Sequence, residues 1–231
     1  MPINKKKIAG EKATEYIKDG MTVGLGTGST AKYLVEKVGE MVKNGLKIQA
    51  VATSRATENM AKELGISLVD VNDVDYIDVA IDGVDEIDRD FNATKGGGGA
   101  LFREKIVASL AKKVIWIMDD SKLVESIGEF PLPVEILPYG YKATFKRLKA
   151  LGYDPVMRLK NNELYVTDNG NYIADLHIGS HANSDDIKQK LDNTVGVLET
   201  GQFLKMCDYI VVGTCNGARV YDAISIKQEK F

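Results

Sequence analysis

Residues 21–30 read MTVGLGTGST, and this stretch decides the fold. The apolar run at 21–25 is typical of a buried strand. Three glycines then alternate with other residues up to position 28, and a helical pattern begins near Thr30. A strand that passes through a glycine turn into a helix is the basic unit of an open α/β sheet.

The same alternation of strand and helix continues on both sides of this stretch. Patterns with helical spacing predict helices at residues 4–19, 30–43, 54–64 and 100–112, with Gly20, Asn44-Gly45 and Gly65 as stops. Short apolar runs predict strands at residues 21–25, 47–52, 67–71, 76–81 and 114–118. Repeated βα units of this length predict an α/β fold: a Rossmann-like, mostly parallel sheet with helices on both faces.

A second pattern begins at Pro131, where three prolines occur within eight residues. Beyond it, strands are expected at residues 134–137, 155–158, 164–167 and 172–178, and helices at 142–151 and 184–191. This order predicts a small α+β domain of the split βαβ, ferredoxin-like type. A strand at 208–212 then returns to the parallel sheet. We therefore expect an α/β catalytic domain at 1–130 and 205–231, with the small domain at 131–204.

The composition excludes several classes of protein. The chain has 231 residues, a net charge of −3, 44% hydrophobic residues and 27% charged residues, so neither disorder nor nucleic acid or acidic membranes as partners are indicated. It has neither an apolar signal segment nor a run long enough to cross a membrane. Cys207 and Cys215 form no CxxC pair, which fits a reducing compartment. We expect a cytoplasmic protein.

The glycine turn at 24–30 is a candidate phosphate site. It lacks the third glycine of a dinucleotide fingerprint, because Ser29 stands there, and it lacks the Gly-Lys-Ser/Thr of a P-loop. It still delivers backbone N–H groups and the hydroxyls of Thr27, Ser29 and Thr30 to the start of a helix, where an anion is favoured. The alternative is a tight turn with Ser29 as a simple N-cap.

An acidic segment, DVAIDGVDEID, occupies residues 78–88. Asp82 ends a predicted strand and therefore faces the crevice where ligands bind in open sheets. Gly83 turns the chain, so that Asp85 can point to the same crevice. Two such close carboxylates repel unless a cation or a proton lies between them. A solvated acidic loop and a Mg²⁺ site are the alternatives.

Lys95 is followed by four consecutive glycines, residues 96–99. Such a run is entropically costly to order, and close approach of backbone N–H groups to an anion is one reason for it. Lys95 is placed to neutralise Asp82 or Asp85, or to meet a developing negative charge. A flexible hinge is the alternative.

Glu104 interrupts an otherwise apolar helix face. It lies three residues after Leu101 and three before Val107, on a stripe that also holds Ala100, Ala108 and Ala111. A carboxylate on an inward face is costly unless it is paired or functional. Partial burial with a tuned pKa suits a general base, and a structural ion pair is the alternative.

Taken in order, these motifs resemble ribose-5-phosphate isomerase of the A type. The match includes GTGST at 26–30, DGVDE at 82–86, KGGG at 95–98 and Glu104, and it continues through DSK at 120–122 and FPLPVE at 130–135. It covers essentially the whole chain. The resemblance implies interconversion of ribose 5-phosphate and ribulose 5-phosphate in the pentose phosphate pathway, by a homodimer or homotetramer without metal or organic cofactor.

The resemblance also implies roles for individual residues. Glu104 would accept the proton, and Asp82, Asp85 and Lys95 would complete the catalytic set. Substrate would be bound by Thr27, Gly28, Ser29, Thr30, Asp82, Gly83, Val84, Asp85, Lys95, Gly96, Gly97, Gly98 and Lys122. The chain departs from the family at Gly99, where alanine is more common, and at residues 213–217, GTCNG, which replace a commoner Pro-Asp pair.

Two other functions remain open at this stage. An amino-sugar phosphate deaminase on a related scaffold would need a catalytic histidine, and neither His177 nor His181 lies in a suitable context. A non-catalytic sugar-phosphate sensor domain is expected to carry a DNA-binding segment, for which 231 residues leave no room.

Overall fold

The computed structural model describes residues 3–179 and 184–223, which form two compact units. The first unit comprises Met1–Val84, Arg103–Leu123 and Lys205–Phe231, and the second comprises Asp85–Phe102 and Val124–Leu204. The expected domain division at 131 and 204 stays a prediction about independent folding. In the structure, residues 85–102 and 124–130 also pack with the second unit.

The first unit is built on a six-stranded sheet with the order β15-β14-β6-β3-β1-β2. All neighbours in it are parallel except β14 and β15, which form an antiparallel hairpin. Its strands are β1 (Thr22–Leu25), β2 (Gln49–Ala52), β3 (Val79–Gly83), β6 (Val114–Asp119), β14 (Tyr209–Thr214) and β15 (Gly217–Asp222). Its helices are α1 (Lys5–Ala13), α2 (Ala31–Lys43), α3 (Arg55–Glu63) and all but the first two residues of α4 (Leu101–Leu110).

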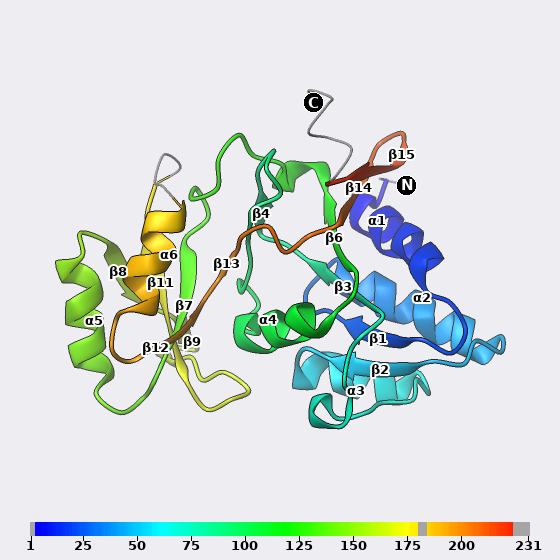
Figure 1. Cartoon of the computed structure of the whole chain (residues 1–231), viewed down its shortest axis with the longest axis horizontal. Coiled ribbons are helices and arrows are strands. Elements are labelled where there is room, and N and C mark those ends of the chain that lie inside the picture. The colour runs from blue at the N-terminus through cyan, green and yellow to red at the C-terminus, as the bar shows by residue number, and fades with distance from the viewer. Residues whose placement is uncertain (1–2, 180–183, 224–231) are drawn as a thin grey trace. The chain divides into compact units, whose positions relative to one another are not determined.

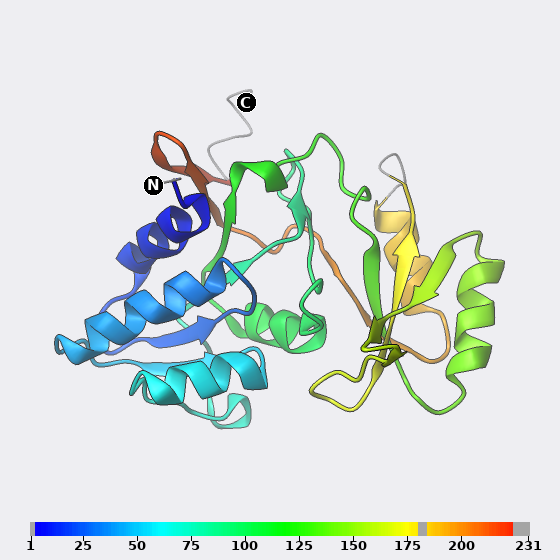
Figure 2. The ribbon, with the colours of Figure 1, turned by 180° about the vertical axis from the view of Figure 1, so that it is seen from behind.

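Helices cover both faces of this sheet, as the sequence predicts. Alternate strand residues point to opposite faces. Val79 and Ile81 pack in one core with α1, α2 and α3, whereas Ala80 packs in another with Val107 of α4. Figure 1 accordingly shows α4 in front of the sheet, and Figure 2 shows the helices of the other face in front.

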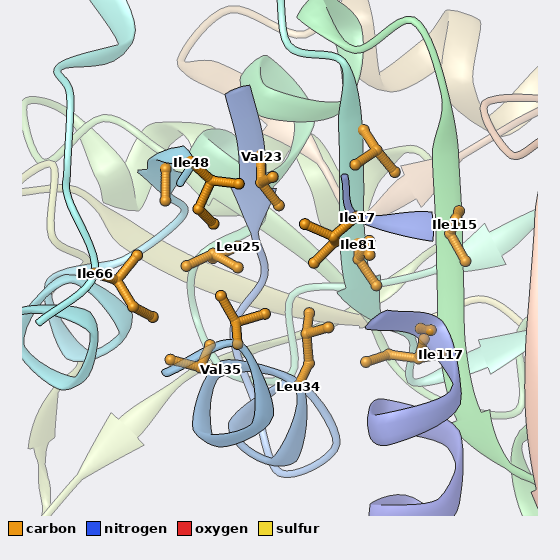
Figure 3. Packing of buried hydrophobic residues seen from close by; sticks show 14 of the residues in the cluster. Ile17, Val23, Leu25, Leu34, Val35, Ile48, Ile66, Ile81, Ile115 and Ile117 are labelled. Carbon is orange, nitrogen blue, oxygen red and sulfur yellow. The ribbon is translucent and has the colours of Figure 1, made fainter. Parts of the chain in front are cut away.

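The larger core lies between the sheet and the helices α1 to α3 (Figure 3). Branched side chains from neighbouring strands meet there, and α2 contributes its buried stripe, which includes Leu34, Val35 and Val38. Gly45, with φ 106°, and Gly65, with φ 74°, each follow their helix, α2 and α3 respectively, after one intervening residue. These left-handed positions explain why the predicted glycine stops end both helices.

The second unit contains a four-stranded antiparallel sheet with the order β12-β7-β11-β8. The chain order β-α-β-β-α-β confirms the predicted split βαβ, ferredoxin-like arrangement. Its elements are β7 (Leu132–Ile136), α5 (Tyr141–Ala150), β8 (Asp154–Met157), β11 (Tyr172–His177), α6 (Ser184–Asp192) and β12 (Val197–Thr200). A hairpin of β9 (Leu159–Lys160) and β10 (Glu163–Leu164) and a small sheet of β4 (Glu86–Ile87), β5 (Ala93–Thr94) and β13 (Gln202–Phe203) complete it.

Several expected elements differ in the structure. The strand expected at 67–71 is reduced to one bridge between Leu68 and Ala50, because the chain turns into a 3₁₀ helix, Val71–Asp73, that Asp70 caps. The strand expected at 164–167 ends at Leu164, beyond which the chain enters a turn at Thr167. The helix expected over 4–19 ends at Ala13 and continues as the 3₁₀ turn Thr14–Tyr16.

The helices of the described part of the chain are short, and none is long and apolar enough to cross a membrane.

Helix α1 packs directly on the backbone of β14, so Gly213 of that strand should tolerate no larger residue. A Cβ atom on Gly213 would lie 1.8 Å from the carbonyl oxygen of Lys5. We expect Gly213→Ala to lower the free energy of unfolding by at least about 2 kcal/mol, because helix and strand must separate. Denaturant titration measures the effect. Val220→Ala on the exposed side of β15 is the control and should stay within about 0.5 kcal/mol; equal stabilities would contradict the close packing.

Candidate functional site

The candidate residues of the first unit gather at one edge of its sheet. The strands β6, β3 and β1 are neighbours and parallel, so their carboxyl ends meet. The glycine turn follows β1, Asp82 lies near the end of β3, and Lys122 follows β6 in the 3₁₀ turn Asp120–Lys122. Strand β1 is also the place where the strand order reverses, with β2 on one side and β3 on the other. Ligands bind at such positions in open α/β sheets.

Asp82 links the ends of β1 and β3. Its Oδ1 atom accepts hydrogen bonds from the backbone N–H groups of Thr27, at 2.8 Å, and Gly83, at 2.7 Å. The carboxylate lies so close to β1 that a Cβ atom on Gly26 would be 2.0 Å from Oδ1. Position 26 therefore requires glycine for close approach. Asp82 is only 3% exposed, so its charge is held by hydrogen bonds rather than by bulk water.

Thr27 joins the turn to α3 through a chain of hydroxyl groups. Its Oγ1 atom donates to Ser54 at 2.8 Å and lies 2.6 Å from the hydroxyl of Thr53. Ser54 accepts the N–H of Thr57 as the N-cap of α3, and the Thr57 hydroxyl donates to the carbonyl of Gly26 at 2.9 Å. Three hydroxyls in TSRAT, residues 53–57, were the signal for the wider cluster.

The start of α2 has the properties of an anion site. Thr30 is the N-cap residue, yet it makes no side-chain capping hydrogen bond, and the first turn contains no acidic residue. The alternative reading of Ser29 as a simple N-cap is therefore wrong: its hydroxyl accepts a hydrogen bond from Lys6 at 2.9 Å instead. The positive end of the helix dipole and a lysine therefore meet at this turn.

Lys6 is a site residue that the sequence analysis missed. Only the fold brings Lys6 to Ser29, which lies 23 residues away in the sequence. Lys6 and Lys122 both act on Asp119. Partial burial raises the pKa of that carboxyl, but hydrogen bonds from Ser121 and these two lysine charges outweigh it and leave the pKa below its usual value. A hollow of about 410 Å³ opens beside Lys6 and Asp119.

Glu104 lies in the first turn of α4, where the sequence places it. It is 4% exposed, and Leu101, Val107 and Ala108 of the same stripe are buried too. The predicted burial of this carboxylate is thus confirmed, while its role as a base stays a prediction.

The second unit holds Asp85 and the tetraglycine turn. Asp85 Oδ2 accepts the N–H of Gly97 at 2.7 Å, and a Cβ atom on Gly97 would meet that carboxylate at 2.6 Å. Lys95 is 1% exposed, its backbone N–H donates to Gly201, and its ammonium lies 5.4 Å from the centre of the Phe203 ring. The turn is therefore ordered, which argues against a flexible hinge.

Glu86, the residue after Asp85, serves a different purpose from its neighbour. It is 2% exposed and accepts hydrogen bonds from the Thr94 hydroxyl and from the backbone N–H groups of Gly128 and Phe130. This carboxylate anchors the segment that leads into β7. The alternative of a solvated acidic loop thus fails for Asp82 and Glu86.

The predicted site residues form two sets within the two units. Thr27 to Thr30, Asp82 to Val84, Glu104 and Lys122 belong to the first unit, and Asp85 and Lys95 to Gly98 belong to the second. The peptide bond between Val84 and Asp85 joins the sets, and α4 begins in the second unit and carries Glu104 in the first. Among the described residues, no three His, Cys, Asp or Glu side chains gather in a way that could hold a metal ion.

Comparison with known proteins identifies the family. The family model for ribose 5-phosphate isomerase A (phosphoriboisomerase A) matches residues 49–217 of this chain. The chain belongs to this family. It is 50% identical over 219 residues to ribose-5-phosphate isomerase A of Bifidobacterium adolescentis, covering 94% of each chain, and 51% identical over 216 residues to that of Listeria monocytogenes, covering 93% of this chain and 96% of the relative.

Solved structures of the family share the fold. Ribose 5-phosphate isomerase A from Methanocaldococcus jannaschii superposes with a TM-score of 0.89 at 34% identity, covering 94% of this chain and 98% of that one. A D-ribose-5-phosphate isomerase in complex with phospho-erythronic acid gives 0.90 at 36% identity, covering 95% of this chain and 100% of that one. The predicted fold class and family are both confirmed.

The hydroxyl cluster predicts a stability role for Ser54. In Ser54→Ala, α3 loses its N-cap and Thr27 loses an acceptor, so we expect a loss of about 1–2 kcal/mol in the free energy of unfolding. Ser109→Ala on the exposed face of α4 is the matched control and should cost less than about 0.5 kcal/mol. Chemical denaturation of both variants measures the difference, and equal losses would contradict the role of the cluster.

Proposed function

We infer that this chain interconverts D-ribose 5-phosphate and D-ribulose 5-phosphate. Membership of the ribose 5-phosphate isomerase A family, at about half identity over nearly the whole chain, carries this inference. The deaminase alternative is not favoured, since His177 is exposed at the end of β11 and His181 lies outside the described residues. The sensor alternative is not favoured either, because the relatives matched over 94% and 96% of their length are named as isomerases.

We assign the proton transfer to Glu104. Aldose–ketose isomerisation needs one base that removes the proton from C2 and returns it to C1 through an enediolate. Glu104 is a buried carboxylate in the first turn of α4, on an otherwise apolar stripe, so it can handle a proton away from bulk water.

The charged groups of the two units complete the proposed catalysis. Asp82 is held by two backbone N–H groups and serves as the acid and base for opening the sugar ring. Lys95 and the turn of Gly96, Gly97 and Gly98 are assigned the stabilisation of the oxyanion that develops on the enediolate. Asp85 keeps the turn in place through Gly97. We also assign to Asp85 the role of fixing Lys95. Gly83 and Val84 contribute backbone contacts to the substrate.

The substrate phosphate is proposed to bind at the start of α2. Thr27, Gly28, Ser29 and Thr30 form the turn that would surround the phosphate, and Lys6 and Lys122 supply positive charge. Anchoring the phosphate orients C1 and C2, which is worth more to the rate than the binding itself.

The ligand of one solved relative fits this reaction. Phospho-erythronic acid carries two carboxylate oxygens on one carbon, beside a hydroxyl-bearing carbon, and so mimics the charge and planarity of an enediolate. We expect it to compete with ribose 5-phosphate in this enzyme.

The remaining parts of the proposal concern context. We propose a homodimer or homotetramer that acts in the cytoplasm, in the pentose phosphate pathway, without metal or organic cofactor. Lys95 can supply the positive charge that a metal ion would otherwise bring to the oxyanion. Turnover should therefore persist in excess chelator.

The decisive test is Glu104→Gln, which preserves the size of the side chain but cannot accept a proton. We expect kcat for ribose 5-phosphate to fall by about 10²–10⁴-fold, while the circular dichroism spectrum and KM change little. Exchange of the C2 hydrogen with deuterium from solvent should be lost in parallel. A folded variant that exchanges this hydrogen at the parental rate would exclude Glu104 as the base and make Asp82 the next candidate.

A second test concerns the phosphate. Lys6→Met should raise KM for ribose 5-phosphate about tenfold with little change in kcat, because a charge-assisted hydrogen bond to phosphate contributes about 1.5–3 kcal/mol. Lys7→Met is the matched control, since Lys7 is exposed on the same helix and its ammonium lies 3.8 Å from the Glu11 carboxylate. Free ribose should be a very poor substrate for all three enzymes. Equal KM values for the two variants would remove Lys6 from the phosphate site.

A further inference from the structure

An ion pair in the second unit contacts the tetraglycine turn, residues 96–99, from its carbonyl side. Arg158 follows β8 and Asp175 lies on β11, where it pairs in register with Val156. Residues 156 and 158 share a face of the sheet, so the guanidinium reaches the carboxylate diagonally across the strands. Nε of Arg158 donates to Asp175 Oδ2 at 2.9 Å and Nη2 donates to Oδ1. Both side chains are largely buried, at 15% and 21% exposure.

The third nitrogen of the guanidinium contacts the turn itself. Nη1 of Arg158 donates to the carbonyl of Gly96 at 2.8 Å and to that of Gly97 at 3.2 Å. Asp175 occupies the other two nitrogens and therefore fixes the direction of the third, because the guanidinium is planar. One planar guanidinium thus binds both Asp175 oxygens and two successive backbone carbonyls, four bonds that the three N–H donors of a lysine ammonium cannot make together.

Side chains of the same unit pack around the turn. Cβ atoms added to Gly96 and Gly99 would lie 2.8 Å from Leu101 Cβ and 2.3 Å from the Tyr165 hydroxyl, respectively. Gly96 and Gly99 also have φ values of 97° and 81°, which only glycine adopts without strain. The departure from alanine at Gly99 therefore matches the presence of the Tyr165 ring. Hydrogen bonds from Arg158 and close packing by Leu101 and Tyr165 together fix the conformation of the turn.

The geometry of the peptide bond fixes where the N–H groups of Gly97 and Gly98 point when the preceding carbonyls are bound. In a planar trans peptide the C=O and the following N–H point in opposite directions. The Gly96 carbonyl points to Arg158, and the N–H of Gly97 in the same peptide accordingly donates to Asp85 at 2.7 Å. The Gly97 carbonyl also points to Arg158, so the N–H of Gly98 points away from it. A positive charge on both carbonyls also polarises both N–H groups and makes them stronger donors.

We propose that Arg158, held by Asp175, is a positioning residue for the isomerase reaction. It fixes two peptide planes of the tetraglycine turn, so that the N–H of Gly97 holds Asp85 and the N–H of Gly98 is aimed at the oxyanion of the enediolate. Arg158 itself does not touch the substrate. The proposal rests on the proposed function and deepens it, since it names the groups that preorganise its oxyanion donors.

The test compares Arg158→Met, Arg158→Lys and Asp175→Asn in the full-length chain. Misaligned donors act on the transition state more than on the bound substrate, so kcat for ribose 5-phosphate should fall about 10- to 100-fold in Arg158→Met, with KM changed less than about threefold. Arg158→Lys should remain about tenfold impaired, because the fork is lost although the charge is kept. Free guanidinium ion should partly restore Arg158→Met but not Arg158→Lys.

Two further measurements separate positioning from simple stability. Amide hydrogen exchange of residues 95–100 should accelerate in Arg158→Met at temperatures where the variant is fully folded. Lys188→Met removes an exposed ion pair of the same unit, with Asp192 on α6, and should change neither kcat nor this exchange. If Arg158→Met does not fold, Asp175→Asn replaces it, because it leaves the arginine in place but unanchored and should lower kcat in the same way.

The outcomes are distinct. A folded Arg158→Met enzyme with parental kcat, or with only KM raised, overturns the positioning role even if the unmodified chain is a good isomerase. Unchanged amide exchange overturns it as well. An unmodified chain that does not convert ribose 5-phosphate refutes the proposed function instead, and the exchange experiment then still decides whether Arg158 holds the turn.

Discussion

The first unit depends on one carboxylate placed between two parallel strands. Asp82 ties the end of β1 to the end of β3 through the N–H groups of Thr27 and Gly83, and its proximity leaves room only for glycine at position 26. The direction of the following turn is set by these bonds, and with it the start of α2. A charged hydrogen bond acceptor at this point therefore organises the surrounding backbone as well as offering an ionisable group.

Charged side chains hold irregular backbone throughout the molecule. Glu86 binds the N–H groups of Gly128 and Phe130, and Asp85 binds that of Gly97. Arg158 binds the carbonyls of the tetraglycine turn, while the fully buried Glu135 accepts hydrogen bonds from Thr167, Asn169 and Asn171 of the turn before β11. Apolar packing orders the sheets, but loops without regular structure need such partners for their backbone groups. In this chain, those loops carry most of the candidate site.

The sequence predicted features that depend on local periodicity and missed those that depend on distant contacts. Glu104 could be found because it interrupts an apolar stripe within its own helix, and the βα units could be found because each repeats a simple pattern. Lys6 could not, since its partner Ser29 comes from another element. Strands of two residues, such as β4 and β13, are too short to show any alternation. The role of Arg158 was equally hidden, because register across β8 and β11 creates it.

The order in which the strands occur along the chain has a consequence for biosynthesis. The chain crosses between the two units after residues 84, 102, 123 and 204, so neither unit is a continuous segment. Strand β14, which pairs with β6 and supports α1, comes only at Tyr209–Thr214. During translation the ferredoxin-like sheet, which ends with β12 at Thr200, is therefore complete before the sheet that begins first. Until then the edge of β6 that later pairs with β14 is unpaired. A nascent chain in this state can pair with another chain through that edge and aggregate.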